Sequence, residues 1–288
     1  MGTDSSDSEL SALVEIVRRA SSIVMGHYDH DVAVDLKGPN DPVTAADREA
    51  DRYICAELRR RFPDAEVVGE ESSPSSRATV AALARHRTVF YVDPLDGTKE
   101  FIAHNGEFSV LIGQCVDGRP TLGVIALPAA DRILAGAVGG PAYAVDRQGE
   151  RWPLTLTSTA RPEQVTLLVS RSHTPPLAER LRGSGRLRRV VPCGSVGVKV
   201  SRLLEGRADA YLHDGGGLKR WDCCGPEAVL RAAGGAMSDL GGALLDYRTE
   251  RLTVDGGLLA SNGAAHQALL ASARAAAADV ANGSGQGV

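Results

Sequence analysis

Two aspartates and a threonine lie close together in the stretch TVFYVDPLDGTKEFI, residues 88–102. Apolar, β-favouring residues lead up to Asp93, and Asp96, Gly97 and Thr98 follow within a few positions. An Asp-Gly pair is a common turn signal and Thr often caps a helix, so a plain turn explains the stretch equally well. The chemical alternative is a divalent cation between carboxylates that would otherwise repel each other, and ligands that are all oxygen suit Mg²⁺. The choice depends on whether the chain provides more ligands.

Further carboxylates occur where strands are predicted to end and helices to begin. Glu70 and Glu71 follow the apolar run AEVVG, Asp47 lies in the first turn of a predicted helix, and Asp222 starts another in KRWDCCGPEAV. Each has an ordinary explanation as a surface charge or as a favourable partner of a helix dipole. Together they occupy the positions at which α/β proteins assemble their sites. The sequence therefore predicts a carboxylate cluster that binds metal ions.

The elements that must position these residues follow from the hydrophobic periodicity. A first helix is predicted over 9–28 and a second from about Thr44, each with one apolar face. AEVVG predicts a short buried strand that ends at Gly69, and residues 72–86 predict a loop followed by a helix. Residues 108–143 contain apolar runs broken by Asp-Gly, Pro and Gly-Gly, which is typical of a β-meander.

Beyond a polar stretch that follows the meander, predicted strands and helices alternate to the end of the chain, which indicates α/β layering. We therefore expect an N-terminal α+β domain over 9–150 with most of the metal ligands, and a C-terminal α/β domain over 151–280 that carries Asp222. Residues 1–8 and 281–288 are polar or Gly-rich and are expected to be disordered.

The composition excludes several classes of protein. With 43% hydrophobic and 24% charged residues, the 288-residue chain is typical of a globular protein. Its net charge of −4 provides no basic field, so we expect neither nucleic acid nor a membrane surface as a partner. Five cysteines without a CxxC pair indicate reduced thiols, and we find neither a signal peptide nor an apolar run that could span a bilayer. We therefore expect a cytoplasmic protein.

The segments GEES, DPLDGT and WDCCGPEA resemble, in order and separation, the signature regions of the Mg²⁺-dependent, lithium-sensitive phosphatases. That superfamily includes inositol monophosphatase, fructose-1,6-bisphosphatase and 3′(2′),5′-bisphosphate nucleotidase, and the resemblance extends over residues 10–275. DGTKEF, NGEFSV, SRSH (170–173) and GSVGVKV (194–200) are more similar to the CysQ-type nucleotidases than to inositol monophosphatases, which tend to have DGTTNF. The pair Cys223–Cys224 departs from the subgroup, which often has a small residue after WD.

The resemblance implies a layered α-β-α-β-α sandwich and a defined reaction. The enzyme would use two to three Mg²⁺ ions to remove the 3′-phosphate of adenosine 3′,5′-bisphosphate (PAP), a by-product of sulfur metabolism, and would release AMP and phosphate. The metal ligands would be Glu70, Asp93 and the Leu95 carbonyl for the first ion, and Asp93, Asp96 and Asp222 for the second.

The resemblance also assigns roles in catalysis and phosphate binding. Thr98 and Glu70 would orient the attacking water, and Asp47 would pair with Thr98 and make its hydroxyl a competent proton acceptor. Gly97 and Thr98 would offer backbone N–H groups to the phosphate at the start of a helix, where the dipole favours an anion.

A bisphosphate needs a second anion site besides the metal ions. The candidates are Arg171 and His173 in SRSH, Lys199, Lys219 and Arg220, although a solvated surface charge explains each of them as well. Three further substrate contacts are expected: Gly194, Ser195 and Asp222.

Other reactive residues are expected to have structural roles. Lys99 and Glu100 would order the metal-binding loop. Cys223 and Cys224 lack the C-x5-R phosphate loop of cysteine phosphatases and are expected to pack near the site. His213, like the other scattered histidines, is expected to be structural.

Other functions stay open at this point. An inositol or sugar monophosphatase could use the same scaffold, as could a phosphatase that acts on a modified nucleotide in a biosynthetic pathway. A non-catalytic sensor would be expected to lack one of the metal ligands, and none is missing. The sequence does not fix the oligomeric state and leaves a homodimer open.

Overall fold

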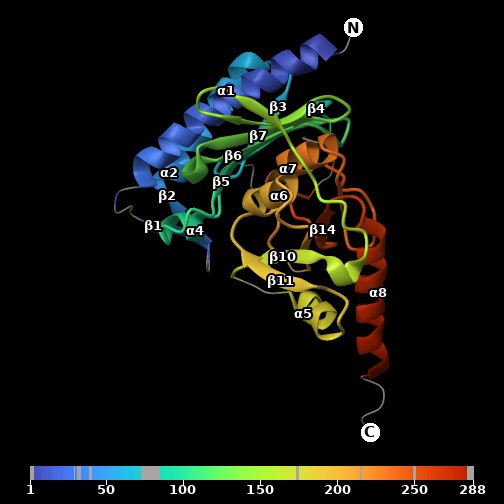
Figure 1. The fold of residues 1–288 in the computed structure, drawn as a ribbon. Helices are drawn as coiled ribbons and strands as arrows, with labels where there is room; N and C mark the ends of the chain where they lie inside the picture. Colours follow the sequence, from blue (N-terminus) through green and yellow to red (C-terminus); the bar gives the residue numbers. More distant parts are fainter. Residues whose placement is uncertain are drawn as a thin grey trace.

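Helices and two large β-sheets alternate in five layers (Figure 1). The computed structural model describes residues 3–28, 30, 34–38, 41–72, 85–172, 175–214, 216–248 and 251–283. The outer helices are α1 (Thr3–Tyr28) and α2 (Ala45–Arg61) on one side and α5 (Pro176–Gly183) and α8 (His266–Gly283) on the other. Between the sheets lie α6 (Val196–Leu204) and α7 (Arg220–Ala232). This arrangement confirms the predicted α-β-α-β-α sandwich.

The first sheet has seven strands in the order β3-β4-β5-β6-β7-β8-β9. Their bounds are β3 (Glu66–Gly69), β4 (Thr88–Asp96), β5 (Ser109–Val116), β6 (Arg119–Leu127), β7 (Arg132–Ala137), β8 (Ala142–Asp146) and β9 (Arg151–Pro153). β3 runs parallel to β4, and every later pair is antiparallel, so the predicted β-meander is present.

The second sheet has five strands in the order β11-β10-β12-β14-β13. Their bounds are β10 (Thr166–Ser170), β11 (Arg189–Cys193), β12 (Ala210–His213), β13 (Ala236–Ser238) and β14 (Leu258–Ser261). The shorter elements are the hairpin β1 (Val34–Gly38) and β2 (Asp41–Thr44), the helix α4 (Thr98–Ile102), and the 3₁₀ turns η1 (Pro128–Ala130) and η2 (Pro162–Gln164).

Both ends of the described chain are more helical than the sequence predicted. α1 begins at Thr3, so the expectation of disorder over 1–8 was wrong from Thr3 onward. Its first residues, TDSSDS, are of types that favour helix starts, which explains why the helix extends beyond the apolar pattern. α8 likewise continues to Gly283, into the expected disordered tail. Most of the predicted loop and helix at 72–86 lies outside the described residues.

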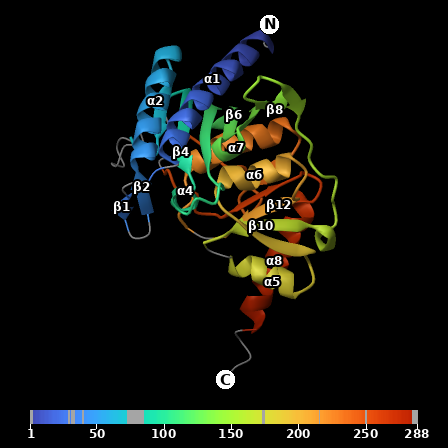
Figure 2. The same cartoon turned by 60° about the vertical axis from the view of Figure 1, so that its left-hand side comes forward.

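The chain crosses from the first sheet to the second between Pro153 and Thr166, close to the predicted domain boundary at 150. α7 nevertheless packs against β4 to β7 of the first sheet, and Figure 2 shows α6 and α7 on the side of that sheet opposite α1 and α2. None of the described helices combines the length and the apolar character needed to cross a membrane.

Strand β4 divides the core because its side chains alternate between the two faces of the sheet. Val89 and Tyr91 join the cluster that α6 and α7 cover, whereas Phe90 and Val92 join the cluster that α1 and α2 cover. All four side chains are buried. A strand covered by helices on both faces is held rigidly, and its carboxyl end is therefore a fixed platform for Asp93 and Asp96.

Helix α7 lies directly on the backbone of the first sheet. Gly113, Gly123 and Gly136 are cross-strand neighbours on β5, β6 and β7, and they form a row beneath the helix. A Cβ atom at Gly113 would lie 2.2 Å from the backbone nitrogen of Gly225, and one at Gly123 would lie 2.2 Å from its carbonyl oxygen. A Cβ atom at Gly136 would lie 2.9 Å from the Cα of Val229. Only glycine permits this contact.

The stability of the fold is expected to depend on pH through Glu227 of α7. Its side chain is fully buried, Tyr247 Oη donates a hydrogen bond of 2.7 Å to it, and Arg231 lies within 3.4 Å. Burial raises the pKa of Glu227 from 4.5 to about 7, so the folded state keeps a proton that the unfolded state has released. The free energy of unfolding therefore falls as the pH rises through this window, by up to about 3 kcal/mol.

Glu227→Gln keeps a carbonyl oxygen for Tyr247 and removes the titration. We expect urea unfolding of the variant at pH 5 and pH 8 to show about 3 kcal/mol less pH dependence than the wild type. Glu163→Gln, a change at an exposed position, is the matched control. An unchanged pH dependence in Glu227→Gln would show that another group causes it.

Candidate active site

The carboxyl end of β4 opens into a cavity of about 740 Å³ that collects the predicted carboxylates. Glu70 follows β3, Asp93 and Asp96 end β4, and Asp222 lies in the first turn of α7; all four line the cavity. The structure thus brings these residues together as predicted, from segments far apart in the sequence. Their roles as ligands stay a prediction.

Burial and mutual repulsion dominate the electrostatics of this cluster. Burial raises the pKa of Asp93 well above its ordinary value, and the charges of Glu70, Asp96 and Asp222 raise it further. Burial and the charge of Asp96 likewise raise the pKa of Asp222, which is hydrogen-bonded to Asp93. Within the described ranges, no Lys, Arg or His forms an ion pair with Asp93, Asp96 or Asp222. These three carboxylates therefore have no directly paired cation in the described part of the chain.

Asp96 is held by the start of α6. Ser195 Oγ and the Gly197 backbone N–H donate to its Oδ2 at 2.5 and 2.7 Å, Ser109 Oγ donates to the same atom at 2.8 Å, and the Val196 N–H donates to Oδ1 at 3.1 Å. Ser195 itself has φ of 48°, which is uncommon for a residue other than glycine. Asp96 thus fixes the start of α6 against β4, a role that the sequence did not suggest.

Asp47 and Thr98 form the contact that the resemblance implied. Thr98 Oγ1 lies 3.0 Å from Asp47 Oδ1 and 3.2 Å from the Leu95 carbonyl oxygen. The other oxygen of Asp47 accepts from the backbone and the hydroxyl of Thr44, the N-cap of α2, at 2.8 and 2.6 Å. Burial raises the pKa of Asp47, although these hydrogen bonds oppose the shift. One carboxylate therefore both caps α2 and orients Thr98.

Asp222 serves its own helix in the same way. Its Oδ2 accepts from the Lys219 backbone N–H at 2.7 Å, which satisfies the start of α7. Asp47 and Asp222 therefore do stabilise the starts of their helices, as the ordinary explanation for both residues holds. It does not account for the side of Asp222 that meets Asp93 in the cavity.

Lys37 of the β1–β2 hairpin is a member of the site that the sequence analysis missed. Its Nζ lies 2.6 Å from Glu70 Oε1 and 2.7 Å from Glu71 Oε1. Burial acts against the charge of Lys37, but Glu70 and Glu71 together raise its pKa above the ordinary value. No local motif marks this lysine, because its partners lie more than thirty residues further along the chain.

The carboxylates of the cavity have the chemistry of a divalent-cation site, although their side chains are not arranged around a common point. Among the described residues, no group of three or more His, Cys, Asp or Glu side chains is arranged to hold a metal ion. The reason is that Glu70 is turned to Lys37, Asp96 to the start of α6 and Asp222 to Lys219. The donor set nevertheless consists of hard oxygens with excess negative charge, which is the chemistry that Mg²⁺ prefers. A metal ion would compete with Lys37 for the carboxylate of Glu70.

If Lys37 competes with the metal for Glu70, Lys37→Met should bind Mg²⁺ more tightly than the wild type, by roughly tenfold, because no cation has to be displaced. Calorimetric titration of the metal-free protein measures this directly. Lys99→Met is the matched control, since Lys99 lines the same cavity and forms no ion pair in the described part of the chain. Weaker Mg²⁺ binding by Lys37→Met would show that Lys37 supports the metal site instead.

A smaller cavity of about 190 Å³ adjoins the first and shares Asp96, Gly97 and Asp222 with it. Lys199 and Ser195 line this second cavity, and their contact with a substrate stays a prediction. Lys199 is only 3% exposed; its Nζ lies 3.2 Å from the Gly194 carbonyl oxygen and 4.9 Å from the centre of the Tyr211 ring. Burial lowers the pKa of Lys199, while Asp96 opposes the shift. A buried cation beside the carboxylates is available for an anion.

Arg171 does not line either cavity. Its guanidinium lies 2.5 Å from Glu107 Oε2, which also accepts from the Gly194 backbone N–H at 2.7 Å, while Arg202 binds the other oxygen of Glu107 at 2.7 Å. The structure thus places Arg171 in an ion pair. Its neighbours Ser170 and Ser172 line both cavities instead. His173 lies outside the described residues.

The remaining candidates divide into lining residues and buried ones. Lys219 lines the larger cavity, whereas the Arg220 side chain packs over the Tyr247 ring at 5.6 Å. His213 was expected to be structural, but it also lines both cavities. Cys223 and Cys224 are fully buried, and burial raises the pKa of both thiols well above the ordinary value, which agrees with packing residues.

Known proteins resemble this chain over most of its length. The model of the inositol monophosphatase family matches residues 6–278. The 3′(2′),5′-bisphosphate nucleotidase CysQ of Escherichia coli (strain K12) is 36% identical over 242 residues, which cover 83% of this chain and 93% of that protein. The 3′(2′),5′-bisphosphate nucleotidase 1 of Homo sapiens is 29% identical over 257 residues, 78% of each chain.

Solved structures resemble the fold as well. CysQ from Bacteroides thetaiotaomicron matches with a TM-score of 0.72 and 29% identity, covering 88% of this chain and 97% of that one. An IMPase from Thermotoga maritima matches with a TM-score of 0.77 over 95% and 99% of the two chains. At 23% identity, the second match shows the fold alone.

Proposed function

The chain belongs to the inositol monophosphatase family, and from this premise we propose that it is a metal-dependent phosphatase that removes the 3′-phosphate of PAP to give AMP and phosphate. The relatives named 3′(2′),5′-bisphosphate nucleotidase support the substrate class. The observation that carries the proposal is the pair of adjoining cavities, one lined by carboxylates and the other by the buried Lys199. With metal ions at the carboxylates, the two cavities would provide adjoining anion-binding regions, which suit a substrate with two phosphates.

Glu70, Asp93, Asp96, Asp222 and the Leu95 carbonyl would hold two to three Mg²⁺ ions. When bound, the ions would neutralise the phosphate and lower the pKa of a water molecule. The protein contributes the fixed positions: β4 is packed on both faces, and α7 rests on the sheet backbone. Rigid placement of charge is what distinguishes such a site from dissolved metal ions.

Thr98 and Glu70 would accept hydrogen bonds from the attacking water and orient it. Because the Thr98 hydroxyl donates its own hydrogen to Asp47 or to the Leu95 carbonyl, its lone pairs are left to face the cavity that it lines. Gly97, the N-cap of α4, has φ of 95°, a left-handed conformation that glycine adopts without strain. This turn would present the N–H groups of Gly97 and Thr98 to the phosphate.

Lys199 would bind the second phosphate, with Ser195 and the Gly194 backbone beside it. Among the described residues, this ammonium group contacts carbonyl oxygens and an aromatic ring, and a phosphate would give it a charged partner. Arg171 would support this region indirectly, because its partner Glu107 binds the N–H of Gly194.

The proposal places the reaction in the cytoplasm, which the five free cysteines support. A homodimer stays a prediction. The alternative substrates are inositol or sugar monophosphates, for which the buried Lys199 would have no evident partner.

A phosphate-release assay over PAP, its sulfated parent, inositol 1-phosphate and fructose 1,6-bisphosphate tests the proposal. We expect PAP to be hydrolysed most efficiently, with a requirement for Mg²⁺ and inhibition by millimolar lithium. Full turnover in excess chelator would exclude the metal mechanism, and preferred hydrolysis of inositol 1-phosphate would exclude the nucleotidase assignment.

A further inference from the structure

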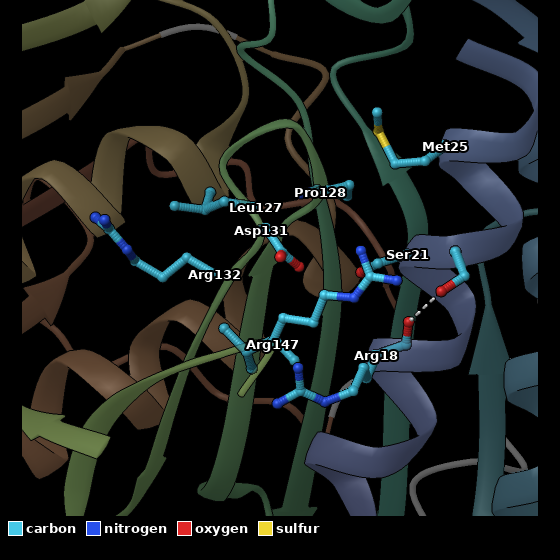
Figure 3. A pocket seen from close by; sticks show the side chains of 10 residues that line it. Arg18, Ser21, Met25, Leu127, Pro128, Asp131, Arg132 and Arg147 are labelled. Atoms are coloured by element: carbon cyan, nitrogen blue, oxygen red, sulfur yellow. Dashed lines mark hydrogen bonds between the residues drawn. The ribbon is translucent and has the colours of Figure 1, made fainter. Parts of the chain in front are cut away.

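A cavity of about 480 Å³ lies between α1 and the segments that border β6, β7 and β8 (Figure 3). It shares no lining residue with the two cavities of the candidate active site. A volume of several hundred cubic ångströms is typical of pockets that bind small molecules. The proposed phosphatase reaction does not use this cavity.

The floor of the cavity is apolar. Leu127, Pro128 and Ile133 line it and are buried in the sheet and the turn η1, and Met25 lines it from α1. Such a floor provides contact area for the body of an organic molecule, and the thioether of methionine adapts to its shape. Bare inorganic anions gain nothing from it.

Two arginines lie at the opening. Figure 3 shows the Arg18 side chain extended from α1 toward Arg147, and the Arg147 side chain extended back toward α1. In the part of the chain that the structure describes, no carboxylate lies within ion-pair distance of either guanidinium. Arg132, by contrast, points away from the cavity and forms an ion pair with Glu205. The positive charge of Arg18 and Arg147 is therefore not neutralised by an ion pair in the described residues.

Asp131 adds a single acceptor to this arrangement. Its carboxylate lines the cavity beside the arginines, and its backbone is held in the left-handed region with φ of 48°. An acceptor next to two cations selects for a ligand that carries a hydrogen-bond donor as well as negative charge. Two donors and one acceptor at fixed positions therefore restrict how a ligand can bind, which a uniformly basic surface would not do.

We propose that this cavity binds a small organic phosphate. The dianionic phosphate would lie between Arg18 and Arg147, and the body of the ligand would rest on Met25, Leu127 and Ile133. Two guanidinium groups match the charge of a phosphate dianion and can each bind it through two parallel hydrogen bonds. A single carboxylate needs only one of them. Phosphate is therefore favoured over carboxylate as the head group.

Phenylphosphonate is a suitable probe, because it has a dianionic head, an apolar ring and a C–P bond that a phosphatase does not hydrolyse. Its binding to the full chain would be measured by calorimetry with a chelator present, which suppresses metal-dependent binding at the active site. We expect saturable binding that weakens by at least about tenfold in Arg18→Met and in Arg147→Met, and disappears in the double variant. Asp131→Asn should bind the probe more tightly, because it removes a repelling charge.

Two controls separate this cavity from the rest of the molecule. Arg161→Met removes an exposed arginine of the same charge elsewhere, and Lys199→Met alters the active site; neither should change the affinity. Benzoate should bind at least about tenfold more weakly than phenylphosphonate. Absence of saturable binding, full affinity in the double arginine variant, or loss of binding in Lys199→Met would overturn the site, and equal affinity for benzoate would overturn its specificity. Thermal unfolding verifies that the variants are folded, and Arg147, which is exposed, provides a test that does not disturb α1.

Discussion

Asp93→Asn is expected to abolish phosphatase activity and at the same time to stabilise the metal-free protein. Asp93 is 2% exposed and lies among Glu70, Asp96 and Asp222, so the substitution removes the most crowded negative charge of the cluster. Asparagine keeps the oxygen that accepts from the Leu95 N–H at 3.0 Å, and its amide can donate to Asp222. The local fold should therefore survive while metal affinity is lost. A rate lower by a thousandfold or more corresponds to about 4 kcal/mol in the activation barrier.

The stability of Asp93→Asn gives the second half of this test. Burial raises the pKa of Asp93, so the folded wild type holds more protons than the unfolded chain and becomes less stable as the pH rises. In chelator at pH 8, the variant should thus unfold at a higher temperature than the wild type, with a smaller difference at pH 5. Asp64→Asn, at an exposed position, is the control. More than about a tenth of the wild-type rate in Asp93→Asn, or a lower unfolding temperature at pH 8, would remove Asp93 from the proposed role.

Lys199→Met is expected to separate a bisphosphate from a monophosphate substrate. Lys199 is buried beside the carboxylates, and methionine of similar length fills its space without a charge. Loss of a charge-assisted hydrogen bond to the second phosphate should lower kcat/KM for PAP by about tenfold to a hundredfold. Hydrolysis of 3′-AMP, which lacks the 5′-phosphate, should change much less.

Arg171→Met provides the comparison for Lys199. Because the Arg171 guanidinium is bound to Glu107, we expect its replacement to have a smaller effect on PAP hydrolysis than that of Lys199. Equal losses on PAP and 3′-AMP in Lys199→Met would show that Lys199 maintains the site as a whole. No loss on PAP would favour an inositol or sugar phosphatase.

The sequence predicted the carboxylate cluster because local patterns determine it. Asp93 and Asp96 stand at the end of a strand, and Asp47 and Asp222 in the first turns of helices, positions that hydrophobic periodicity and capping preferences reveal. The five-layer fold followed from the same alternation together with the family resemblance.

Contacts between distant segments could not be predicted in this way. Lys37 reaches Glu70 from a hairpin with no motif, and Arg171 is neutralised by Glu107, which lies 64 residues earlier. Lys199 was one of several cationic candidates, and its depth in the protein becomes visible only when α6 packs between the sheets. The residue type of a charged side chain does not reveal whether the side chain contacts solvent, a carboxylate or a substrate.

The row of glycines under α7 makes the position of Asp222 independent of substitutions among the surrounding side chains. A helix that rests on side chains shifts whenever those side chains change in size, and a residue at its start would be carried along. α7 rests on backbone atoms of β5, β6 and β7, with no side chain between Gly225 and the strands at Gly113 and Gly123. The distance between Asp222 and Asp93 should therefore not change when the surrounding hydrophobic side chains are replaced. The distance between the two carboxylates therefore depends on three glycines that take no part in the reaction. One added methyl group at any of these glycines would push α7 away from the sheet and move Asp222 away from Asp93.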